Sequence, residues 1–376
     1  MAVGAGRRLN AVRAILLNPG PVSLSDGVRR AAVAEDLCHR EPEFFDLQDA
    51  LVDGLVEVYG LDREEWTAVL LGGSGTTALE AMLSSLMPAD ARVLVLENGV
   101  YGERIARICA LHGIAHEALR RGWTEAIDLA AVEEALETGG FTHVAAVHHE
   151  TTTGRLNPAG ALADLCEAHG ARLVLDGVSS FGAEEIPFTS AALDAAAATA
   201  NKCLHGIPGL AFVLCRRSAL DAAPAPRTLY LHLPLWAEHQ ARRSTPFTPP
   251  VNACLALRQA LVELRAQGGW TARRARYHRL AASVRRTLEA EGVDPFLPPE
   301  ESSCVLRSYR LPAGRRYASL HDALKQRGFV IYAGQGGLAE EMFRISTMGE
   351  ITDYDLGVLE GALRDVFAGT ARATAP

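Results

Sequence analysis

The sequence predicts an α/β protein in which a large domain with a mostly parallel sheet is followed by a smaller α/β domain. Three observations support this prediction. The chain has 376 residues, which is more than one compact domain usually contains. Between residues 68 and 215, short apolar runs alternate with amphipathic stretches, a pattern typical of a parallel sheet that is covered on both faces. After residue 252, helical periodicity and short strand-like runs begin again.

The first region contains six strand-like runs, which in chain order are AVLL, RVLVLE, HVAAVHH, RLVLD, AAAATA and LAFVLC. Parallel sheets bind their ligands at the carboxyl ends of the strands. Polar residues that directly follow these runs are therefore the first candidates for a functional site.

The segment 218–252 is rich in proline and contains STPFTPP, which predicts an extended surface connection without a core element. Two helices are predicted next, LALRQALVELRAQ and WTARRARYHRLAASVRRTLEAEG, with arginines on a solvent-exposed face. The tail adds a strand at CVLRSY, a helix at YASLHDALKQRG, strands near VIYAG and MFRIST, and a last helix with its N-cap at Thr352. The predicted divisions are an N-terminal segment 1–22, a large domain 23–255 and a small domain 256–376.

Charge and cysteine usage favour small-molecule partners. The formal net charge of −8 and the pI of about 5.9 give no general attraction to nucleic acid or to anionic membranes. The apolar run near the N-terminus is too short for a signal peptide or a membrane span, so we expect a cytoplasmic protein. The seven cysteines occur singly without a CxxC motif, which predicts buried reduced thiols and no metal site.

The run AVLL leads into GGSGTT at residues 72–77 and then into ALEAMLSSLM, which consists of good helix formers. A glycine loop between a strand and a helix N-terminus offers free backbone N–H groups to an anion, usually a phosphate. A Walker loop is excluded because no lysine follows the glycines. The pattern GxGxxA at 73–78, with Glu97 ending the next strand, also matches the nucleotide-binding loop of an NAD-binding oxidoreductase. A plain structural turn is the third interpretation.

An acid and a lysine follow two of the later strands. Asp176 stands at the end of the strand-like run RLVLD. Lys202 lies 26 residues later (202 − 176), in the loop NKCLHGIPG. This spacing equals one crossover and one strand, so both residues should reach the same edge of the sheet. The alternatives are an acid that only caps a helix and a lysine that is only a surface residue.

Pyridoxal phosphate chemistry requires these three features together. Its aldehyde needs a lysine amine, its ring nitrogen needs an anionic partner, and its phosphate needs a backbone cup. Three further groups fit the same chemistry. Tyr101 follows RVLVLE and is suited to stack on the ring, a threonine of ETTTG at 150–154 is suited to bond the phenolic oxygen, and Arg344 in MFRIST is suited to bind a substrate anion.

These residues lie within an ordered series of motifs that resembles class V pyridoxal-phosphate aminotransferases, and most closely the 2-aminoethylphosphonate:pyruvate transaminases. The resemblance covers roughly residues 14 to 350, and its motifs are NPGPV, CHREPEF, GGSGTTALEA, NGVYGER, HETTTGRLNP, DGVSSFG, NKCLHGIPG, FTPP and FRISTMGE.

The resemblance implies a fold type I homodimer with a seven-stranded sheet, pyridoxal 5'-phosphate as cofactor, and active sites at the subunit interface. It implies that Lys202 forms the Schiff base, Asp176 pairs with the ring nitrogen and Tyr101 stacks on the ring. The cup corresponds to Ser74, Gly75 and Thr76. Thr153 is similar to the residue that bonds the phenolic oxygen, Thr248 to a hydroxyl given to the neighbouring subunit's phosphate, and Arg344 to the substrate carboxylate clamp.

Four positions depart from the family pattern and leave the substrate open. Cysteine is common where His149 stands, an acidic residue is usual at His205, and Thr-His often replaces Val251 and Asn252. The implied reaction moves the amino group of 2-aminoethylphosphonate to pyruvate. The alternatives are an alanine:glyoxylate or serine:pyruvate transaminase, an NAD-binding oxidoreductase, and a cysteine desulfurase, which would need a mobile thiol where Cys304 resembles a strand residue.

Overall fold

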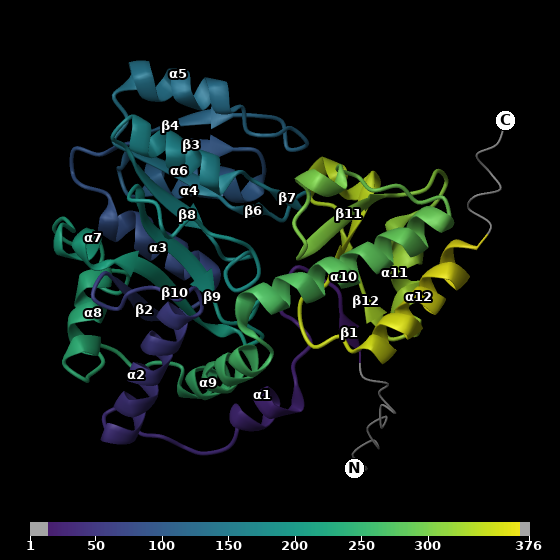
Figure 1. The fold of residues 1–376 in the computed structure, drawn as a ribbon, viewed down its shortest axis with the longest axis horizontal. Helices are drawn as coiled ribbons and strands as arrows, with labels where there is room; N and C mark the ends of the chain where they lie inside the picture. The colour runs from purple at the N-terminus through teal and green to yellow at the C-terminus, as the bar shows by residue number, and fades with distance from the viewer. Residues whose placement is uncertain (1–13, 369–376) are drawn as a thin grey trace, which may run out of the picture.

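A computed structural model describes residues 14–368. The remaining parts of the predicted N-terminal segment and small domain, 1–13 and 369–376, lie outside the described residues. Figure 1 shows a larger lobe built around one extended sheet and a smaller lobe formed mainly by the C-terminal third of the chain, with helix α10 (Gly269–Ala290) running between them. Within the described residues, no helix is both long and apolar enough to cross a membrane.

The large sheet has seven strands, which confirms the predicted α/β fold. Their order is β2 (Trp66–Gly73), β10 (Gly209–Arg216), β9 (Leu193–Thr199), β8 (Arg172–Asp176), β5 (His143–Val147), β3 (Arg92–Glu97) and β4 (Ala115–Arg120). Only β10 runs against its neighbours. The edge strand β4 is absent from the six predicted runs because its sequence, AHEALR, is half-exposed and has no continuous apolar stretch.

Both faces of this sheet are buried, as its apolar strands predict. In β2, Ala68 and Leu70 pack on one face, while Val69 and Leu71 pack on the other. One face is covered by α2 (Pro42–Glu57), α5 (Leu129–Gly139), α6 (Ala159–Ala168) and α9 (Val251–Ala266). The other face is covered by α3 (Gly75–Leu86), α4 (Val100–Leu111) and α8 (Leu233–Ala241). The sheet is therefore rigid, and its carboxyl edge offers fixed positions for side chains.

The prediction that residues 218–252 contain no core element is wrong. The segment contains the end of α7 (Arg217–Asp221) and the whole of α8, in which Leu233 and Trp236 are buried against the sheet. Pro234 lies in the first turn of α8, where the missing N–H of proline costs no hydrogen bond. The prolines therefore begin a helix here, and the apolar residues three positions apart give it a buried face.

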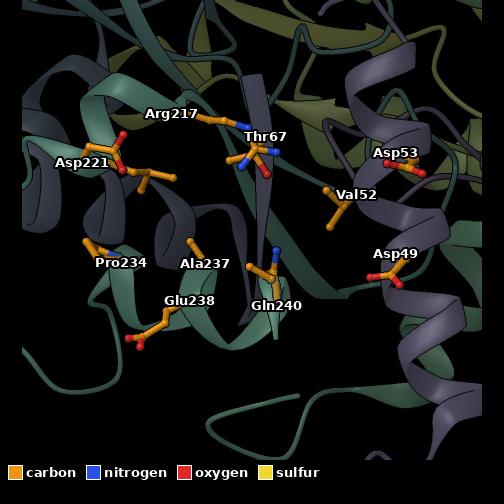
Figure 2. Close-up of a pocket in the computed structure, with 12 residues that line it drawn as sticks. Asp49, Val52, Asp53, Thr67, Arg217, Asp221, Pro234, Ala237, Glu238 and Gln240 are labelled. Carbon is orange, nitrogen blue, oxygen red and sulfur yellow. The ribbon is translucent and has the colours of Figure 1, made fainter. Parts of the chain in front are cut away.

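A cavity of about 710 Å³ lies between α2, α7, α8 and β2, as Figure 2 shows. Four carboxylates and a single arginine line it, namely Asp49, Asp53, Asp221, Glu238 and Arg217. None of the predicted site residues lies there. Its negative lining is unsuited to a phosphate, so this larger cavity is not the expected cofactor site.

The smaller lobe contains an antiparallel sheet and three main helices. The sheet order is β11 (Leu306–Arg310), β14 (Met342–Ser346) and β13 (Tyr332–Ala333), and the helices are α10, α11 (Tyr317–Gln326) and α12 (Asp353–Phe367). The N-terminal strand β1 (Ile15–Leu16) joins this lobe by pairing with β12 (Phe329–Val330). Thr352 accepts a bond from the Asp355 backbone N–H, which confirms the predicted N-cap. The predicted boundary between the large and the small domain, at residues 255/256, falls inside α9. The division into these domains stays a prediction.

Five short elements complete the described chain. They are α1 (Asp26–Ala31), β6 (His149–Glu150), β7 (Arg155–Leu156) and the two 3₁₀ turns at Pro299–Glu301 and Gly336–Glu340. The predicted run HVAAVHH is divided between two strands, since β5 ends at Val147 and β6 begins at His149. The chain turns away from the large sheet between them, and β6 pairs with β7. His149 thus leaves the strand and turns toward the sheet edge.

The sequence predicted that the arginines of α10 lie on a solvent-exposed face, but not all of them do. Arg273 is 2% exposed, and its Nη1 donates to the carbonyl oxygen of Cys203 at 2.7 Å. Arg274 donates from Nε to Glu184 at 3.2 Å. These contacts arise because α10 packs across both lobes, so its arginine face meets polar groups of the large lobe.

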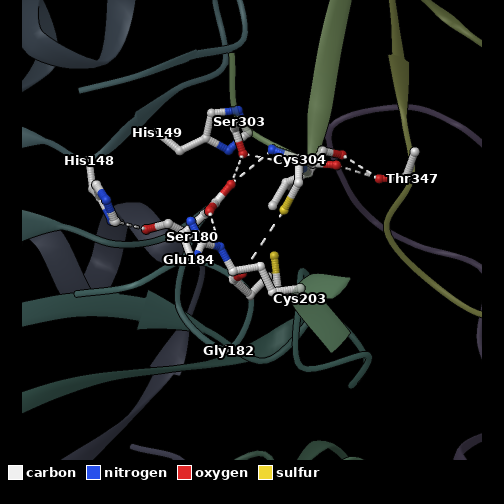
Figure 3. Close-up of polar contacts among 12 residues, drawn as sticks. His148, His149, Ser180, Gly182, Glu184, Cys203, Ser303, Cys304 and Thr347 are labelled. Carbon is white, nitrogen blue, oxygen red and sulfur yellow. Dashed lines mark hydrogen bonds and ion pairs between the residues drawn. The ribbon is translucent and has the colours of Figure 1, made fainter. Parts of the chain in front are cut away.

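Glu184 joins the two lobes through a buried polar cluster (Figure 3). Its Oε1 accepts bonds from the hydroxyl of Ser303 at 2.6 Å and the backbone N–H of Cys304 at 2.9 Å. Its Oε2 pairs with Arg274. Although His278 lies close to Glu184 and Cys304, both carboxylate oxygens already have donors, which favours a structural role for this cluster.

Replacing Glu184 with glutamine is expected to lower the free energy of unfolding by about 1–3 kcal/mol at pH 7, because Arg274 loses its anionic partner. Burial opposes ionisation of this carboxyl, but the bonds from Ser303 and Cys304 outweigh burial and lower its pKa from 4.5. An acid with a lower pKa in the folded chain stabilises the fold above its unfolded pKa and loses that contribution as pH falls. Urea denaturation across pH should therefore show a difference that narrows below pH 4.5. A difference independent of pH would contradict this account.

Candidate active site

A cavity of about 180 Å³ lies at the carboxyl edge of the large sheet, where the sequence places the candidate site. Residues that follow five different strands line it, namely Ser74, Gly75, Thr76, Leu79, Tyr101, Arg104, Val147, His149, Asp176, Val178, Ser179, Thr199, Asn201 and Lys202. The cavity thus brings together six of the predicted site residues, which are up to 128 positions apart in the chain (202 − 74).

The predicted phosphate cup forms the start of α3. β2 ends at Gly73, and Ser74 is the N-cap of the helix. The Thr77 N–H already donates to the Ser74 carbonyl oxygen, whereas the N–H groups of Gly75 and Thr76 have no intrahelical acceptor and are free for an anion. A side chain at Gly75 would place its Cβ 2.6 Å from Val178, so the close packing on Val178 requires glycine.

Lys202 and Asp176 face the same cavity. The Lys202 Nζ donates to the Ser179 hydroxyl oxygen at 2.7 Å, and the Asp176 Oδ1 accepts from the Val178 backbone N–H at 3.0 Å. Burial lowers the pKa of Lys202, partly offset by the charge of Asp176. Burial raises the pKa of Asp176, partly offset by Val178 and Lys202. The lysine is therefore biased toward the neutral amine, which is the nucleophilic form.

Tyr101 is held from two sides. Its backbone N–H donates to Glu150 Oε2 at 3.2 Å, and the guanidinium carbon of Arg104 lies 4.7 Å from the centre of its ring. Glu150 is fully buried, and burial raises its pKa to about 6. A side chain at Gly99 would place its Cβ 2.2 Å from the Glu150 side chain, so only glycine permits this contact at the start of α4.

His149 lines the cavity as a neutral imidazole. Its Nδ1 lies 3.0 Å from the Ser179 carbonyl oxygen and must carry the hydrogen, since a carbonyl only accepts. Burial lowers its pKa to about 4. Its Nε2 is buried and has no hydrogen-bond partner among the described residues. The ring therefore presents an unoccupied acceptor to the cavity.

Three predicted site residues do not line this cavity. Arg344 is 1% exposed and donates from Nη1 to the Thr151 carbonyl oxygen at 2.6 Å and from Nε to the Ala333 carbonyl oxygen at 2.8 Å. Thr153 is also buried, whereas Thr248 is exposed on the large lobe. Within residues 14–368, Arg344 Nη2 and Thr153 Oγ1 are buried without a hydrogen-bond partner. Such unpaired buried groups are expected where a ligand supplies the partner.

Sequence reasoning missed several residues that line the cavity, among them Arg104, Ser179 and Asn201. Arg104 had a detectable signal, because it follows Tyr101 by three positions in the amphipathic stretch after RVLVLE, and residues three apart share one face of a helix. Ser179 follows Asp176 by three positions in the same loop, and Asn201 is adjacent to Lys202. Proximity to a predicted site residue would have identified all three.

Two alternative interpretations lose their structural basis. Glu97, the acid expected to bind a nucleotide ribose, is buried and accepts from Arg120 Nε at 2.9 Å. Cys304, the thiol that a cysteine desulfurase would need, is 1% exposed, and burial raises its pKa well above 9.0. The predicted strand CVLRSY begins at Cys304, but the observed strand β11 begins two residues later, at Leu306. Cys304 is nevertheless a buried thiol and not one on a mobile loop, so it is not reactive there. Six of the seven cysteines are buried, as predicted.

Comparison with known sequences agrees with this arrangement. The sequence model of the aminotransferase class-V family matches residues 63–344. The 2-aminoethylphosphonate–pyruvate transaminase of Vibrio cholerae serotype O1 is 35% identical over 358 residues, covering 93% of this chain and 96% of that protein. The protein of the same name from Burkholderia ambifaria is 37% identical, covering 91% of this chain and 92% of its own.

Solved structures of aminotransferases share the whole fold. An aspartate aminotransferase of subgroup IV from Thermus thermophilus superposes with a TM-score of 0.86 at 30% identity, covering 94% of this chain and 99% of its own. The pyridoxamine–pyruvate aminotransferase of Mesorhizobium loti gives a TM-score of 0.85 at 30% identity, covering 96% and 93%. The predicted fold type I is thereby confirmed.

The residues of the cavity fit pyridoxal 5'-phosphate, the cofactor of this family. Lys202 is a desolvated amine, Asp176 is a carboxylate 5% exposed, and the start of α3 offers free N–H groups. The unpaired buried atoms of His149, Thr153 and Arg344 are further groups that a ligand can satisfy. The chain belongs to the class-V aminotransferase family and is a pyridoxal-phosphate-dependent aminotransferase.

Proposed function

We propose that this enzyme moves the amino group of 2-aminoethylphosphonate to pyruvate, giving phosphonoacetaldehyde and L-alanine. The observation that supports it most is the identity of 35% and 37%, over more than nine-tenths of the chain, to the two transaminases that carry this name. The cavity independently supports the transaminase chemistry of this reaction, because Lys202, Asp176 and the start of α3 meet there.

The bound cofactor supplies an aldehyde that takes up the amino group and a ring that delocalises the electrons left on carbon. We assign to Lys202 the covalent attachment of that aldehyde and the transfer of the proton at the nitrogen-bearing carbon of the substrate. The lowered pKa of Lys202, caused by burial, keeps its amine available as a base. Asp176 is the only carboxylate that lines the described cavity, and we assign to it the partner of the ring nitrogen. Tyr101 is assigned the ring face.

The substrate anion is assigned to Arg344. Its Nη1 and Nε are held by backbone carbonyl oxygens, which fixes the plane of the guanidinium and leaves Nη2 unpaired. A fixed planar fork is well suited to a carboxylate, such as that of pyruvate. Thr153 is assigned the phenolic oxygen, since its buried hydroxyl also lacks a partner among the described residues.

We also infer that the enzyme acts as a homodimer in the cytoplasm. Thr248 is exposed and does not line the cavity of its own chain, so its hydroxyl is free to reach the phosphate of a second copy. The cytoplasmic assignment is supported by seven cysteines that form no disulfide in the described chain.

The proposed donor can be tested by a half-reaction. The holoenzyme is mixed with one amine at a time, and loss of the visible absorbance of the lysine-linked cofactor is followed. We expect rapid loss with 2-aminoethylphosphonate and slow loss with ethanolamine, which lacks the phosphonate. Rapid loss with L-serine and none with 2-aminoethylphosphonate, together with turnover of glyoxylate, would instead favour the alanine:glyoxylate or serine:pyruvate assignment.

Substituting Arg344 with lysine is expected to raise KM for pyruvate by about ten- to hundredfold, since a point charge cannot replace the planar fork. The measurement is steady-state kinetics with pyruvate varied at saturating donor. The lysine variant retains the positive charge, so the rest of the site should stay intact. An unchanged absorbance of the bound cofactor is the control for this. An unchanged KM for pyruvate would show that Arg344 does not bind the acceptor.

A further inference from the structure

Arg104 is a cation of the cavity lining whose charge acts on Asp176 without a direct ion pair. It lies on α4, three residues after Tyr101, and lines the cavity with its side chain half-buried. Among residues 14–368 it forms no ion pair with any carboxylate. The neighbouring acid, Glu103, accepts instead from Trp123 Nε1 at 2.7 Å. A partly desolvated guanidinium without an acid is unusual unless a ligand supplies the anion.

Basic side chains outnumber acidic ones in the lining of the cavity. Its lining contains two basic side chains, Arg104 and Lys202, and a single acid, Asp176. His149 adds no charge, since burial keeps it neutral. When the amine of Lys202 is consumed by its bond to the cofactor, Arg104 remains as the positive group near the start of α3. Because Asp176 is assigned to the ring nitrogen, the anion that pairs with Arg104 has to come from the ligand.

Two contacts fix where Arg104 points. Its Nη1 donates to the Thr76 hydroxyl oxygen at 3.3 Å, which places the guanidinium beside the first turn of α3. Its guanidinium carbon lies 4.7 Å from the centre of the Tyr101 ring, which holds the side chain along that ring. These contacts use the hydroxyl and the ring face, and they leave other N–H groups of the fork without a partner. The fork is thus directed to the same place as the free N–H groups of Gly75 and Thr76.

We propose that Arg104 is a cofactor-binding residue that completes the phosphate site with a side-chain cation, beyond the backbone cup of Ser74, Gly75 and Thr76. Helix N–H groups alone carry only partial charges, whereas a guanidinium supplies a full charge and a matching fork to a phosphate. Arg104 also couples the two ends of the cofactor, because the same side chain contacts the cup at Thr76 and the ring-stacking Tyr101.

The test compares two forms of the vitamin that differ only in the phosphate. The full-length chain is stripped of cofactor and titrated with pyridoxal 5'-phosphate and, separately, with pyridoxal. We expect Arg104→Met to raise Kd for pyridoxal 5'-phosphate by about 10- to 100-fold, the range of a charge-assisted bidentate pair, and to change Kd for pyridoxal by less than about threefold. Arg104→Lys should fall between wild type and Arg104→Met. The readout is binding, so it does not depend on the donor proposed above.

The matched control is Arg107→Met. Arg107 is exposed, lies about one helical turn further along α4 and does not line this cavity. Its substitution therefore removes the same charge from the same helix at a position outside the cavity. It should leave both Kd values unchanged. An equal loss of affinity for the two vitamin forms in Arg104→Met would overturn the proposal, because Arg104 would then act through Tyr101 or the fold. Unchanged affinity for both would overturn it as well. A wild-type chain that binds neither form would overturn the cofactor assignment together with this one.

Discussion

Replacing Lys202 with alanine is expected to abolish both transamination and the visible absorbance of the lysine-linked cofactor. General acid–base catalysis by one side chain contributes roughly 10²- to 10⁴-fold, and Lys202 is assigned the covalent attachment in addition. We therefore expect turnover to fall by more than about 10⁴-fold. Alanine is expected to retain the fold, because the Lys202 amine makes a single side-chain hydrogen bond among the described residues, to the Ser179 hydroxyl oxygen. The measurement is the absorbance spectrum after dialysis, followed by the assay of alanine formation.

The chain offers an unusually clean control for this experiment. Of its 37 basic residues only two are lysines, Lys202 and Lys325. Lys325 lies exposed on α11, so Lys325→Ala should keep full activity and absorbance. Reduction of the holoenzyme with borohydride, followed by peptide mass analysis, should place the cofactor on the peptide that contains Lys202. Cofactor found on Lys325, or a Lys202→Ala variant that retains the band after dialysis, would contradict the assignment.

Much of the large lobe was predictable because its strands are uniformly apolar. The predicted runs RVLVLE and RLVLD have the same boundaries as β3 and β8. A strand that is buried on both faces has an uninterrupted apolar interior, so its ends are easy to locate in the sequence. β4 was not predictable in this way, because an edge strand has one solvent-exposed side and therefore alternates. α8 was missed for another reason. Proline is read as a chain breaker, yet in the first turn of a helix it costs nothing.

The site was predictable to the extent that its residues directly follow strands. Asp176, Tyr101 and Lys202 could be located because parallel strands deliver their carboxyl ends to one edge. The unpaired state of Arg104 and of His149 Nε2 was not predictable, because a missing partner depends on every residue around it and not on local sequence. The same limit applies to Arg273, whose burial depends on how α10 crosses between the two lobes.

Replacing Asp176 with asparagine is expected to lower kcat by about 10²–10³-fold while the cofactor stays attached to Lys202. The range is the cost of removing one preorganised electrostatic group from a reacting centre. Asparagine keeps an oxygen that can accept from the Val178 N–H, so the local turn should persist. It loses the charge that holds a proton on the ring nitrogen, and a neutral ring is a weaker electron sink. Stopped-flow measurement of the half-reaction separates this chemical step from binding.

The pKa relationships in the cavity give this variant a second signature. The charge of Asp176 raises the pKa of Lys202 and partly offsets the lowering that burial causes. Without that charge, the Lys202 amine of the cofactor-free chain should lose its proton at lower pH than in wild type. Reaction of the stripped chain with pyridoxal, followed against pH, should therefore shift toward lower pH in Asp176→Asn. Glu184→Gln, which removes a different buried carboxylate outside the cavity, should leave that profile unchanged. An equal shift in both variants would mean that general loss of stability, and not the charge of Asp176, controls the amine.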